Sequence, residues 1–394
     1  MIKHCYFGAL LSLGAGSAWA DVSLSTLDLG LGMAVDAYEH TEKGRPEQQV
    51  AALYSIKAKL LAGDAFAAAL EGKGACCDDD WFNLKQLNAS YATDNLRFLL
   101  GYDVLRWGKT TLHSPVDTIN AIDYREDITG QQKRGQFILS AKALDLFGGT
   151  AELVLVPRSN EDQLPEFTTT GMPLRMLRAE SKGNNSGAAL RYSRNIGGFH
   201  LGVSAHDMPA QQRQVLGVQL RANYLGLLSS QPRARFAGLE VQKDLSSALI
   251  VSADAAAGTY QLLRSASRDD FHAYSLGLDY SLPVAFSDEH SANLLLEKHY
   301  DSRDALAPTF YQDDWYLGVN YALNDVANTL LRAGYIEDME YNTRIYTASV
   351  ARQFFEGRAQ LTLRYFAVHG DDPLDKLYLF EEFNGTRLEV MYLF

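Results

Sequence analysis

The chain has 394 residues, with 36 Lys and Arg against 48 Asp and Glu, which gives a net charge of −12 at neutral pH. This acidic balance argues against a nucleic-acid partner, which needs a basic face. After residue 20 there is also no unbroken apolar run of the ~18 residues that a membrane helix requires, so any contact with lipid has to be made by strands.

The first twenty residues have the layout of a secretory signal peptide. A positive charge at Lys3 precedes a short apolar run, and Ala18-Trp19-Ala20 provides the small residues of a cleavage site. We predict cleavage after Ala20, so that residues 21–394 form the mature protein. No Cys directly follows this site, so a lipoprotein anchor is not expected.

Alternation with a period of two dominates the mature sequence. In DDWYLGVNYAL, every odd position from Trp315 to Leu323 is apolar or aromatic. This pattern is typical of a strand with one apolar and one polar face. About eighteen such segments, each near ten residues long, cover 27–38, 49–62, 65–73, 82–91, 95–106, 134–144, 149–157, 186–194, 198–207, 233–243, 248–260, 271–282, 290–300, 313–323, 327–337, 342–353, 358–368 and 385–394.

Two stretches leave alternatives open. VLGVQLRANYL at 215–225 is also patterned, and it is either structure within a loop or part of another hairpin. The adjacent pair Cys76-Cys77 in GACCDDDW cannot join distant parts of the chain. We favour a polar loop with two incidental thiols there over a vicinal redox disulfide or a metal site with Asp78, Asp79 and Asp80.

The connections between the segments alternate in length. Short joints lie at 92–95, 195–198, 324–326 and 356–357, and the long polar segments are 108–133, 158–185, 208–232 and 369–384. Short turns on one rim and long loops on the other are typical of a bacterial outer-membrane barrel. A soluble sandwich would mix loop lengths at both of its ends.

The polar faces of the predicted strands carry charges beside small residues, which suits a water-filled lumen better than a solvent-exposed sheet. We therefore predict an all-β fold, a closed antiparallel transmembrane barrel of about 18 strands (16–18), which is monomeric and lies in the outer membrane. The charges that we expect to face the lumen are Arg97, Asp103, Arg191, Asp254, Glu297, Arg332 and Arg364.

The chain ends on a patterned strand, TRLEVMYLF. An even number of strands returns Phe394 to the rim where the first strand starts, so this last strand closes the barrel and satisfies its edge hydrogen bonds. Alternating apolar residues before a C-terminal Phe, with Tyr392 two positions earlier, resemble the signal shared by Gram-negative outer-membrane barrels. That resemblance implies recognition by the barrel-assembly machinery.

A second resemblance covers residues 96–127, which are similar to a stretch of outer-membrane proteins of the alginate-export type and their uncharacterised relatives. It departs from that pattern at Gly101-Tyr102-Asp103, where many relatives have Gly-Arg-Gln, and at Ala121, where Pro is common. The resemblance implies an eighteen-stranded channel with loops folded into the lumen. The matching residues are Trp107, Gly108, Lys109, Asp117, Asn120, Asp123, Arg125 and Glu126.

The segment 108–133 is the third outward loop of this topology. A loop in that place could fold inward and set the selectivity of the pore by its charges. Alternatively, Asp123, Arg125 and Glu126 form a salt-bridged latch that holds the loop to the wall, and both interpretations stay open. The candidate constriction residues are Trp107, Lys109, His113, Asp117, Asn120, Asp123, Arg125 and Glu126.

These features predict an outer-membrane channel for hydrophilic or amphipathic small solutes or for an exported polymer, in contact with outer-membrane lipid and lipopolysaccharide. The alternative is a non-conducting structural or adhesive barrel that binds a partner through its loops. We expect no catalysis, because His113-Ser114 and His272 with Ser275 do not share a strand face as a hydrolase site would need. No cofactor or metal is expected, and a polymer exporter would need a periplasmic or inner-membrane partner.

Overall fold

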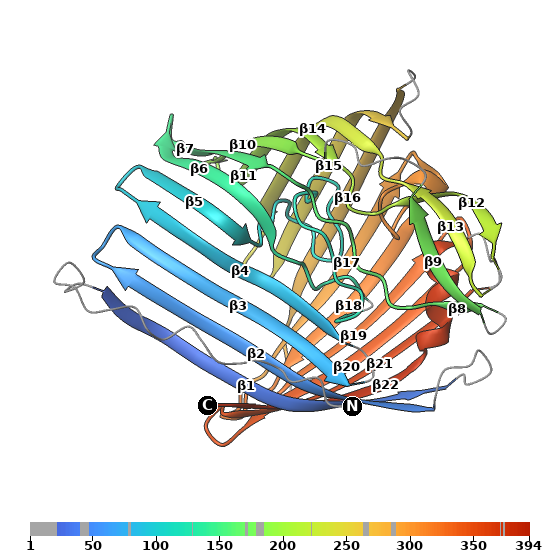
Figure 1. The fold of residues 1–394 in the computed structure, drawn as a ribbon. Helices are drawn as coiled ribbons and strands as arrows, with labels where there is room; N and C mark the ends of the chain where they lie inside the picture. The colour runs from blue at the N-terminus through green and yellow to red at the C-terminus, as the bar shows by residue number, and fades with distance from the viewer. Residues whose placement is uncertain are drawn as a thin grey trace.

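The computed structural model describes residues 22–39, 47–77, 80–127, 129–169, 172–178, 185–221, 223–262, 268–284, 289–370, 372 and 375–394. In these ranges the chain forms an 18-stranded antiparallel barrel, closed by pairing of the first strand with the last (Figure 1). The predicted fold class is confirmed. Residues 1–21, with the predicted signal peptide and its cleavage site, lie outside the described residues.

Each of the eighteen segments predicted from the sequence overlaps one barrel strand. In chain order the barrel strands are β1 (Val22–Tyr38), β2 (Gln48–Ala62), β3 (Phe66–Cys77), β4 (Trp81–Ala92), β5 (Leu96–Asp103), β6 (Gln136–Leu146), β7 (Gly149–Val156), β10 (Gly187–Ile196), β11 (Phe199–Pro209), β14 (Arg233–Asp244), β15 (Leu249–Gln261), β16 (Asp269–Leu282), β17 (Ser291–Asp301), β18 (Asp314–Ala322), β19 (Leu330–Asp338), β20 (Arg344–Phe354), β21 (Ala359–His369) and β22 (Gly385–Leu393).

The outer face of the barrel is apolar along its strands. On β1 the side chains of Leu29, Leu31 and Met33 are 41–59% exposed, while their neighbours Gly30, Gly32 and Ala34 face inward. A water-soluble fold would bury such a surface, whereas the hydrocarbon of a bilayer covers it. No helix among the described residues is long and apolar enough to span a membrane.

The last strand closes the barrel as the sequence predicted. β22 pairs with β1 from Gly385 opposite Tyr38 to Leu393 opposite Gly30. The backbone N–H of Phe394 then donates to the carbonyl oxygen of Leu29 at 2.8 Å. The pairing leaves no free sheet edge at the seam, which hydrocarbon would not tolerate. Recognition of Tyr392 and Phe394 by the assembly machinery stays a prediction.

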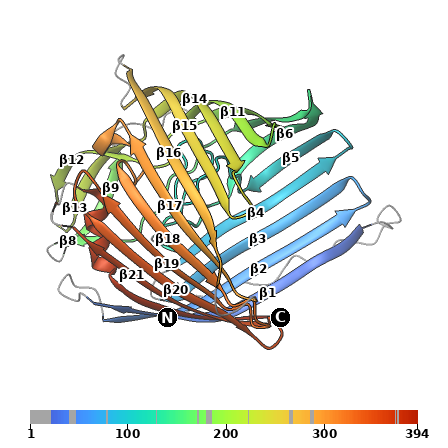
Figure 2. The same ribbon diagram turned by 180° about the vertical axis from the view of Figure 1, so that it is seen from behind.

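Short turns gather at one end of the barrel and longer loops at the other (Figure 2). Between β10 and β11 the turn is Gly197-Gly198, with φ of 58° and 80°, as a two-residue hairpin turn requires. At the opposite end residues 104–135 connect β5 to β6, and 370–384 connect β21 to β22 through the 3₁₀ segment η2 (Lys376–Phe383). A second 3₁₀ segment, η1 (Asp304–Leu306), lies between β17 and β18.

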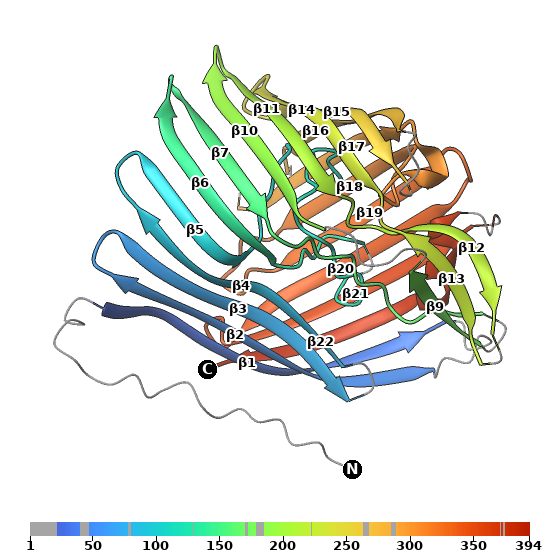
Figure 3. The ribbon, with the colours of Figure 1, turned by 45° about the horizontal axis from the view of Figure 1, so that its top comes forward.

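A separate four-stranded sheet, here called the outer sheet, stands at the long-loop end (Figures 1 and 3). Its order is β12-β13-β9-β8, and β13 runs parallel to β9. The stretch 215–225 is thus part of a hairpin, one of the two alternatives that the sequence left open. The strands are β8 (Thr168–Thr169), β9 (Met172–Arg178), β12 (Gln214–Leu220) and β13 (Leu225–Ser230).

The prediction of a loop at Cys76-Cys77 was wrong. Both residues are the last of β3 and pair with Ala52 and Ala51 of β2. The run of acidic residues after them made the whole stretch look polar, but the strand alternation continues to its edge. Asp78 and Asp79, and the side chain of Cys77, lie outside the described residues.

Candidate functional site: a loop in the lumen and the cavity beside it

Residues 104–135, here called the lumen loop, leave the wall after β5 and run inside the barrel before β6 begins (Figure 3). Apolar side chains of the loop pack on one side of the wall. Trp107, Val116 and Ile119 are 0–3% exposed and form one cluster with residues of β6, β7, β10, β11 and β14–β16. This half of the lumen is therefore filled by packed side chains.

Two buried carboxylates of the wall hold the tip of the lumen loop. Asp254 on β15 accepts hydrogen bonds from the backbone N–H groups of Lys109 and Thr110, at 2.7 and 2.9 Å. Glu297 on β17 accepts from the N–H groups of Thr111 and Leu112, at 2.5 and 2.9 Å. Hydrogen bonds to a charged acceptor are stronger than neutral ones, so these four N–H groups fix the tip against the wall opposite β5.

Asn120 clamps the two ends of the lumen loop together. Its side-chain oxygen accepts from the N–H of Leu105 at 2.8 Å, and its amide donates to the carbonyl oxygens of Asp103 and Arg134, both at 2.8 Å. Asn120 is only 3% exposed. An ion pair between Lys133 and Asp117 lies beside this clamp. The two ends of the lumen loop are therefore held close together.

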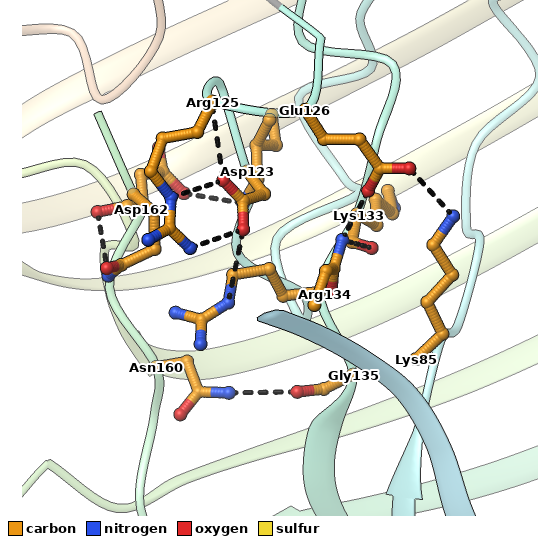
Figure 4. Close-up of polar contacts among 12 residues, drawn as sticks. Lys85, Asp123, Arg125, Glu126, Lys133, Arg134, Gly135, Asn160 and Asp162 are labelled. Atoms are coloured by element: carbon orange, nitrogen blue, oxygen red, sulfur yellow. Dashed lines mark hydrogen bonds and ion pairs between the residues drawn. The ribbon is translucent and has the colours of Figure 1, made fainter. Parts of the chain in front are cut away.

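Figure 4 shows the polar contacts of residues 123–135, the second half of the lumen loop, with the wall and with the loop after β7. Asp123, fully buried, receives a two-pronged contact from Arg125 at 2.9 and 2.8 Å. Glu126 accepts from Asn83 of β4 at 2.8 Å and lies 3.6 Å from the ammonium of Lys85. The latch of the sequence analysis thus has two parts, a pair within the loop and a carboxylate bound to the wall.

A cavity of about 1040 Å³ lies on the other side of the lumen loop. Its wall is formed by β1, β2, β4 and β17–β22, and its other side by the loop. Cationic side chains from the wall are Arg332, Arg364 and Arg387. The carboxylates that border the cavity are Asp36, Asp80, Glu126, Asp127 and Glu166.

Of the eight constriction candidates, only Arg125 and Glu126 border this cavity. Trp107 and Asn120 are buried in the fold of the loop, and Asp117 pairs with Lys133 within it. The ring of His113 packs against His299 at 5.9 Å between ring centres, and the backbone of Lys109 binds Asp254. Most candidates therefore position the loop rather than line the open space.

The predicted lumen charges serve several purposes. Arg191 of β10 makes a two-pronged contact with Glu240 of β14 at 2.7 and 2.6 Å. Asp103 accepts from Gln86 at 2.9 Å, and Arg97 stands opposite Lys142 on the neighbouring strand. These charges are local wall contacts, whereas Arg332 and Arg364 border the cavity.

Glu389 on β22 is the shared carboxylate of two arginines that border the cavity, Arg364 and Arg387. It is 4% exposed and lies 2.8 Å from Arg387, 3.4 Å from Lys73 and 3.8 Å from Arg364. Asp36 neutralises Arg387 further, at 3.2 Å. Arg332 differs, because it makes no hydrogen bond or ion pair with any described residue and is exposed to the cavity.

Replacement of Glu389 by Ala is expected to destabilise the barrel by about 3–5 kcal/mol, because it removes a buried carboxylate that three cations share. Arg387 then keeps only Asp36, Lys73 keeps only Glu126, and Arg364 keeps no carboxylate among the described residues. Glu71→Ala is the matched control, since its pair with Lys57 is 4.0 Å long and solvent-exposed and should contribute at most about 1 kcal/mol. Urea-induced unfolding of the two variants in lipid vesicles measures this difference. Equal midpoints for both variants would contradict it.

Aromatic side chains from several loops gather at the long-loop mouth. Tyr124 of the lumen loop packs against Phe310 at 4.9 Å and Phe380 of η2 at 5.9 Å, measured between ring centres. Phe167 and Phe383 belong to the same buried cluster. The cluster joins the lumen loop to the last loop of the chain.

Asp162, in the loop after β7, joins that loop to the lumen loop. Its carboxylate accepts from the N–H of Ile122 at 2.8 Å. Burial, and to a smaller extent the neighbouring Asp123 and Glu161, raises the pKa of Asp162 to about 7. In a detached loop the group would have its ordinary pKa of about 4, so the docked loop binds the proton more tightly.

The contact between these loops is therefore expected to be strongest below about pH 4, to weaken as the pH rises to about 7, and to change little above that value. In bilayer recordings, brief current fluctuations should become more frequent between pH 4 and pH 7. Asp162→Asn keeps an oxygen acceptor for Ile122 but cannot titrate, so its recordings should not depend on pH in this range. The same pH profile in both proteins would rule out Asp162 as the cause.

Several important residues were not singled out from the sequence. Asp254 and Glu297 were named as lumen charges, but their role as acceptors for the backbone of the loop was not foreseen. The alternation of the last strand places Arg387 and Glu389 among the inward-facing charges, but their shared contacts were not foreseen, and Asp162 was not singled out. The inward position of Arg387 and Glu389 on the last strand, beside the opposite-facing Leu388, was the one signal available for them.

No family model matches the sequence, and no curated protein matches it either. Among solved structures the chain is similar to OpdQ of Pseudomonas aeruginosa, at 10% identity and a TM-score of 0.54, with 95% of this chain and 98% of that chain covered. OccAB3 of Acinetobacter baumannii is 12% identical with a TM-score of 0.53, and the match covers 95% of this chain and 99% of that chain. A BenF-like porin from Pseudomonas fluorescens Pf-5 is 11% identical with a TM-score of 0.53, and the match covers 95% of this chain and 98% of that chain.

At these identities the likeness shows the fold alone. The chain has the fold of these outer-membrane barrels, with eighteen antiparallel strands closed around a lumen. The resemblance of residues 96–127 to the alginate-export type stays a prediction.

Proposed function

We propose that the protein is a channel through which small hydrophilic or amphipathic solutes cross the outer membrane. The observation that carries this proposal is the cavity of about 1040 Å³ between the lumen loop and the wall. The loop fills the side of β6–β16 with apolar packing and leaves a space beside β17–β22 that charged side chains border. A solid plug would need no such charged space, whereas a diffusion path does.

The charges around the cavity favour solutes that are themselves charged. Arg332, Arg364 and Arg387 lie on the wall, and Glu126 and Asp127 lie on the lumen loop. A solute with a negative group and a hydrogen-bond donor, such as a zwitterion, would be oriented between these two sides. Arg332 has no partner among the described residues, so its charge is available to a solute.

Polymer export is the less favoured use of this fold. The aromatic cluster around Phe310 and Phe380 packs loops together at the outer mouth, where an extended polymer would need a wide exit. A partner on the periplasmic side would also have to supply the energy. A non-conducting adhesive barrel remains the alternative of a different class, and it predicts no current.

A catalytic role is not part of the proposal, although three side chains resemble the order of a hydrolase triad. The hydroxyl of Ser275 lies 2.8 Å from Nδ1 of His299, and Glu297 lies 3.3 Å from Nε2. All three are at most 2% exposed. Glu297 also binds the backbone of the lumen loop, so we assign the group to support of the loop.

Two measurements on the refolded full-length barrel test the proposal. Single-channel current in a planar bilayer reports a path for ions, and swelling of liposomes in solutions of amino acids, sugars and dicarboxylates reports which solutes enter. We expect discrete current steps and faster swelling with small charged solutes than with sugars of equal mass. A folded barrel that shows neither would overturn the channel and favour the adhesive alternative.

A further inference from the structure

The outer sheet exposes apolar side chains to an unusual extent. On β12, Val215, Val218 and Leu220 are 46%, 61% and 74% exposed, and Met176 on β9 is 39% exposed. These residues belong to a sheet separate from the eighteen strands of the barrel, so the wall of the barrel does not account for their exposure. Such an exposed apolar patch usually marks a contact surface.

The same sheet is cationic in an acidic protein. Its four strands and the turn between β12 and β13 contain Arg175, Arg178 and Arg221 but no Asp or Glu, whereas the whole chain carries −12. The guanidinium of Arg175 stacks on the ring of Tyr224 at 5.0 Å, and Arg221 donates to Gln219 at 3.0 Å. Neither of these two arginines pairs with a carboxylate among the described residues.

Further positive charge lies at the base of the hairpin. The hairpin of β12 and β13 lies between β11 and β14 in the chain. The alternation of β14 places Arg233 and Arg235 on its outer face, at the start of the strand. Both contact the single carboxylate of Asp207, at 2.5 and 2.9 Å. One charge of the pair is therefore not neutralised, and the side chain of Arg235 is 51% exposed.

We propose that the outer sheet and this end of β14 bind the anionic glycolipid of the outer leaflet. The arginines contact its phosphate groups, and Val218 and Leu220 contact its acyl chains. Figures 1 and 3 place the sheet at the long-loop end, with β12 outermost, which is the side where the barrel meets that leaflet. The combination of apolar and cationic groups is typical of protein surfaces that lie on an anionic membrane.

Charge complementarity decides between the possible occupants. Two copies joined through the free edge of β12 would bring their arginines together, and like charges in a contact are unfavourable. A small soluble anion would use the arginines but leave the apolar side chains uncovered. An amphipathic anion satisfies both groups. The inference needs the outer-membrane location of the barrel, but not its conductance.

The test uses the refolded full-length protein in detergent and measures binding of bis-phosphorylated lipid A, dephosphorylated lipid A and inorganic phosphate by native mass spectrometry. The charge variant combines Arg175→Gln, Arg221→Gln and Arg235→Gln, and the apolar variant combines Val218→Ser and Leu220→Ser. Matched controls are Arg194→Gln and Val326→Ser, at the short-turn end, where Val326 is fully exposed. Heat-shifted gel mobility reports folding of every variant.

We expect the unmodified protein to bind bis-phosphorylated lipid A at least about tenfold more tightly than the dephosphorylated form, since several arginines face the phosphates. The charge variant should lose this preference, and the apolar variant should bind both lipids more weakly, while the controls match the unmodified protein. Equal affinity for the two lipids would overturn the proposal. Full displacement by inorganic phosphate, or dimers that the apolar variant abolishes, would overturn it too.

Discussion

Removal of residues 109–132 is expected to raise the single-channel conductance about threefold or more, because the lumen loop restricts the cross-section that limits the current. The loop fills the side of the lumen at β6–β16, and the open cavity lies beside it. An eighteen-stranded wall without such a loop encloses a wide channel. The barrel itself should still close, since the pairing of β1 with β22 does not involve the loop.

A milder change tests whether the position of the lumen loop matters while the loop itself is kept. Asp254→Asn with Glu297→Gln keeps the size of both side chains but removes the charges that four N–H groups of the loop share. We expect noisier current and a smaller rise in mean conductance. Asp279→Asn is the control, a wall carboxylate with no contact to the loop among the described residues. Unchanged conductance in a folded deletion variant would show that the lumen loop, including the Tyr124 that it contributes to the aromatic cluster, does not limit the current.

The barrel was predictable from the sequence because a strand between lipid and a lumen needs an apolar residue at every second position. A residue such as Leu317 faces lipid since it lies two positions from Trp315 and Val319, and the same alternation recurs in the other strands, interrupted only where a bulge shifts the register, as between Leu24 and Thr26. The seam was predictable as well, because an open edge in hydrocarbon is too costly and the last strand had to pair with the first. Both inferences need only local patterns and a count of strands.

The interior of the loop was not predictable in the same way. The lumen loop has no regular secondary structure, so its sequence has no periodicity. The sequence therefore does not indicate that Trp107 packs into a core while Arg125 borders the cavity. The anchors Asp254 and Glu297 bind backbone N–H groups, and every residue except proline has such a group, so the sequence carries no sign of the partner. The Cys76-Cys77 strand was missed because the charges that follow it masked an intact alternation.

Replacement of Arg332 by Glu is expected to move the ion preference of the channel toward cations. The other cations of the wall share carboxylates, since Arg364 and Arg387 both lie near Glu389. Arg332 has no such partner and faces the cavity, so its whole charge acts on passing ions. The substitution changes the net charge of the lining by two units without disturbing an existing pair.

The reversal potential in a tenfold salt gradient measures this change, and a shift on the order of 10 mV toward cation preference is expected. Arg97→Glu is the matched control, because it also reverses an inward-facing arginine of the wall but does not border the cavity. Its shift should be much smaller. Equal shifts in the two variants would mean that ions do not pass beside β19, and that the path runs outside the cavity we describe. A shift confined to Arg332→Glu ties the current to this wall, where the unpartnered guanidinium is also the group that a charged solute would meet.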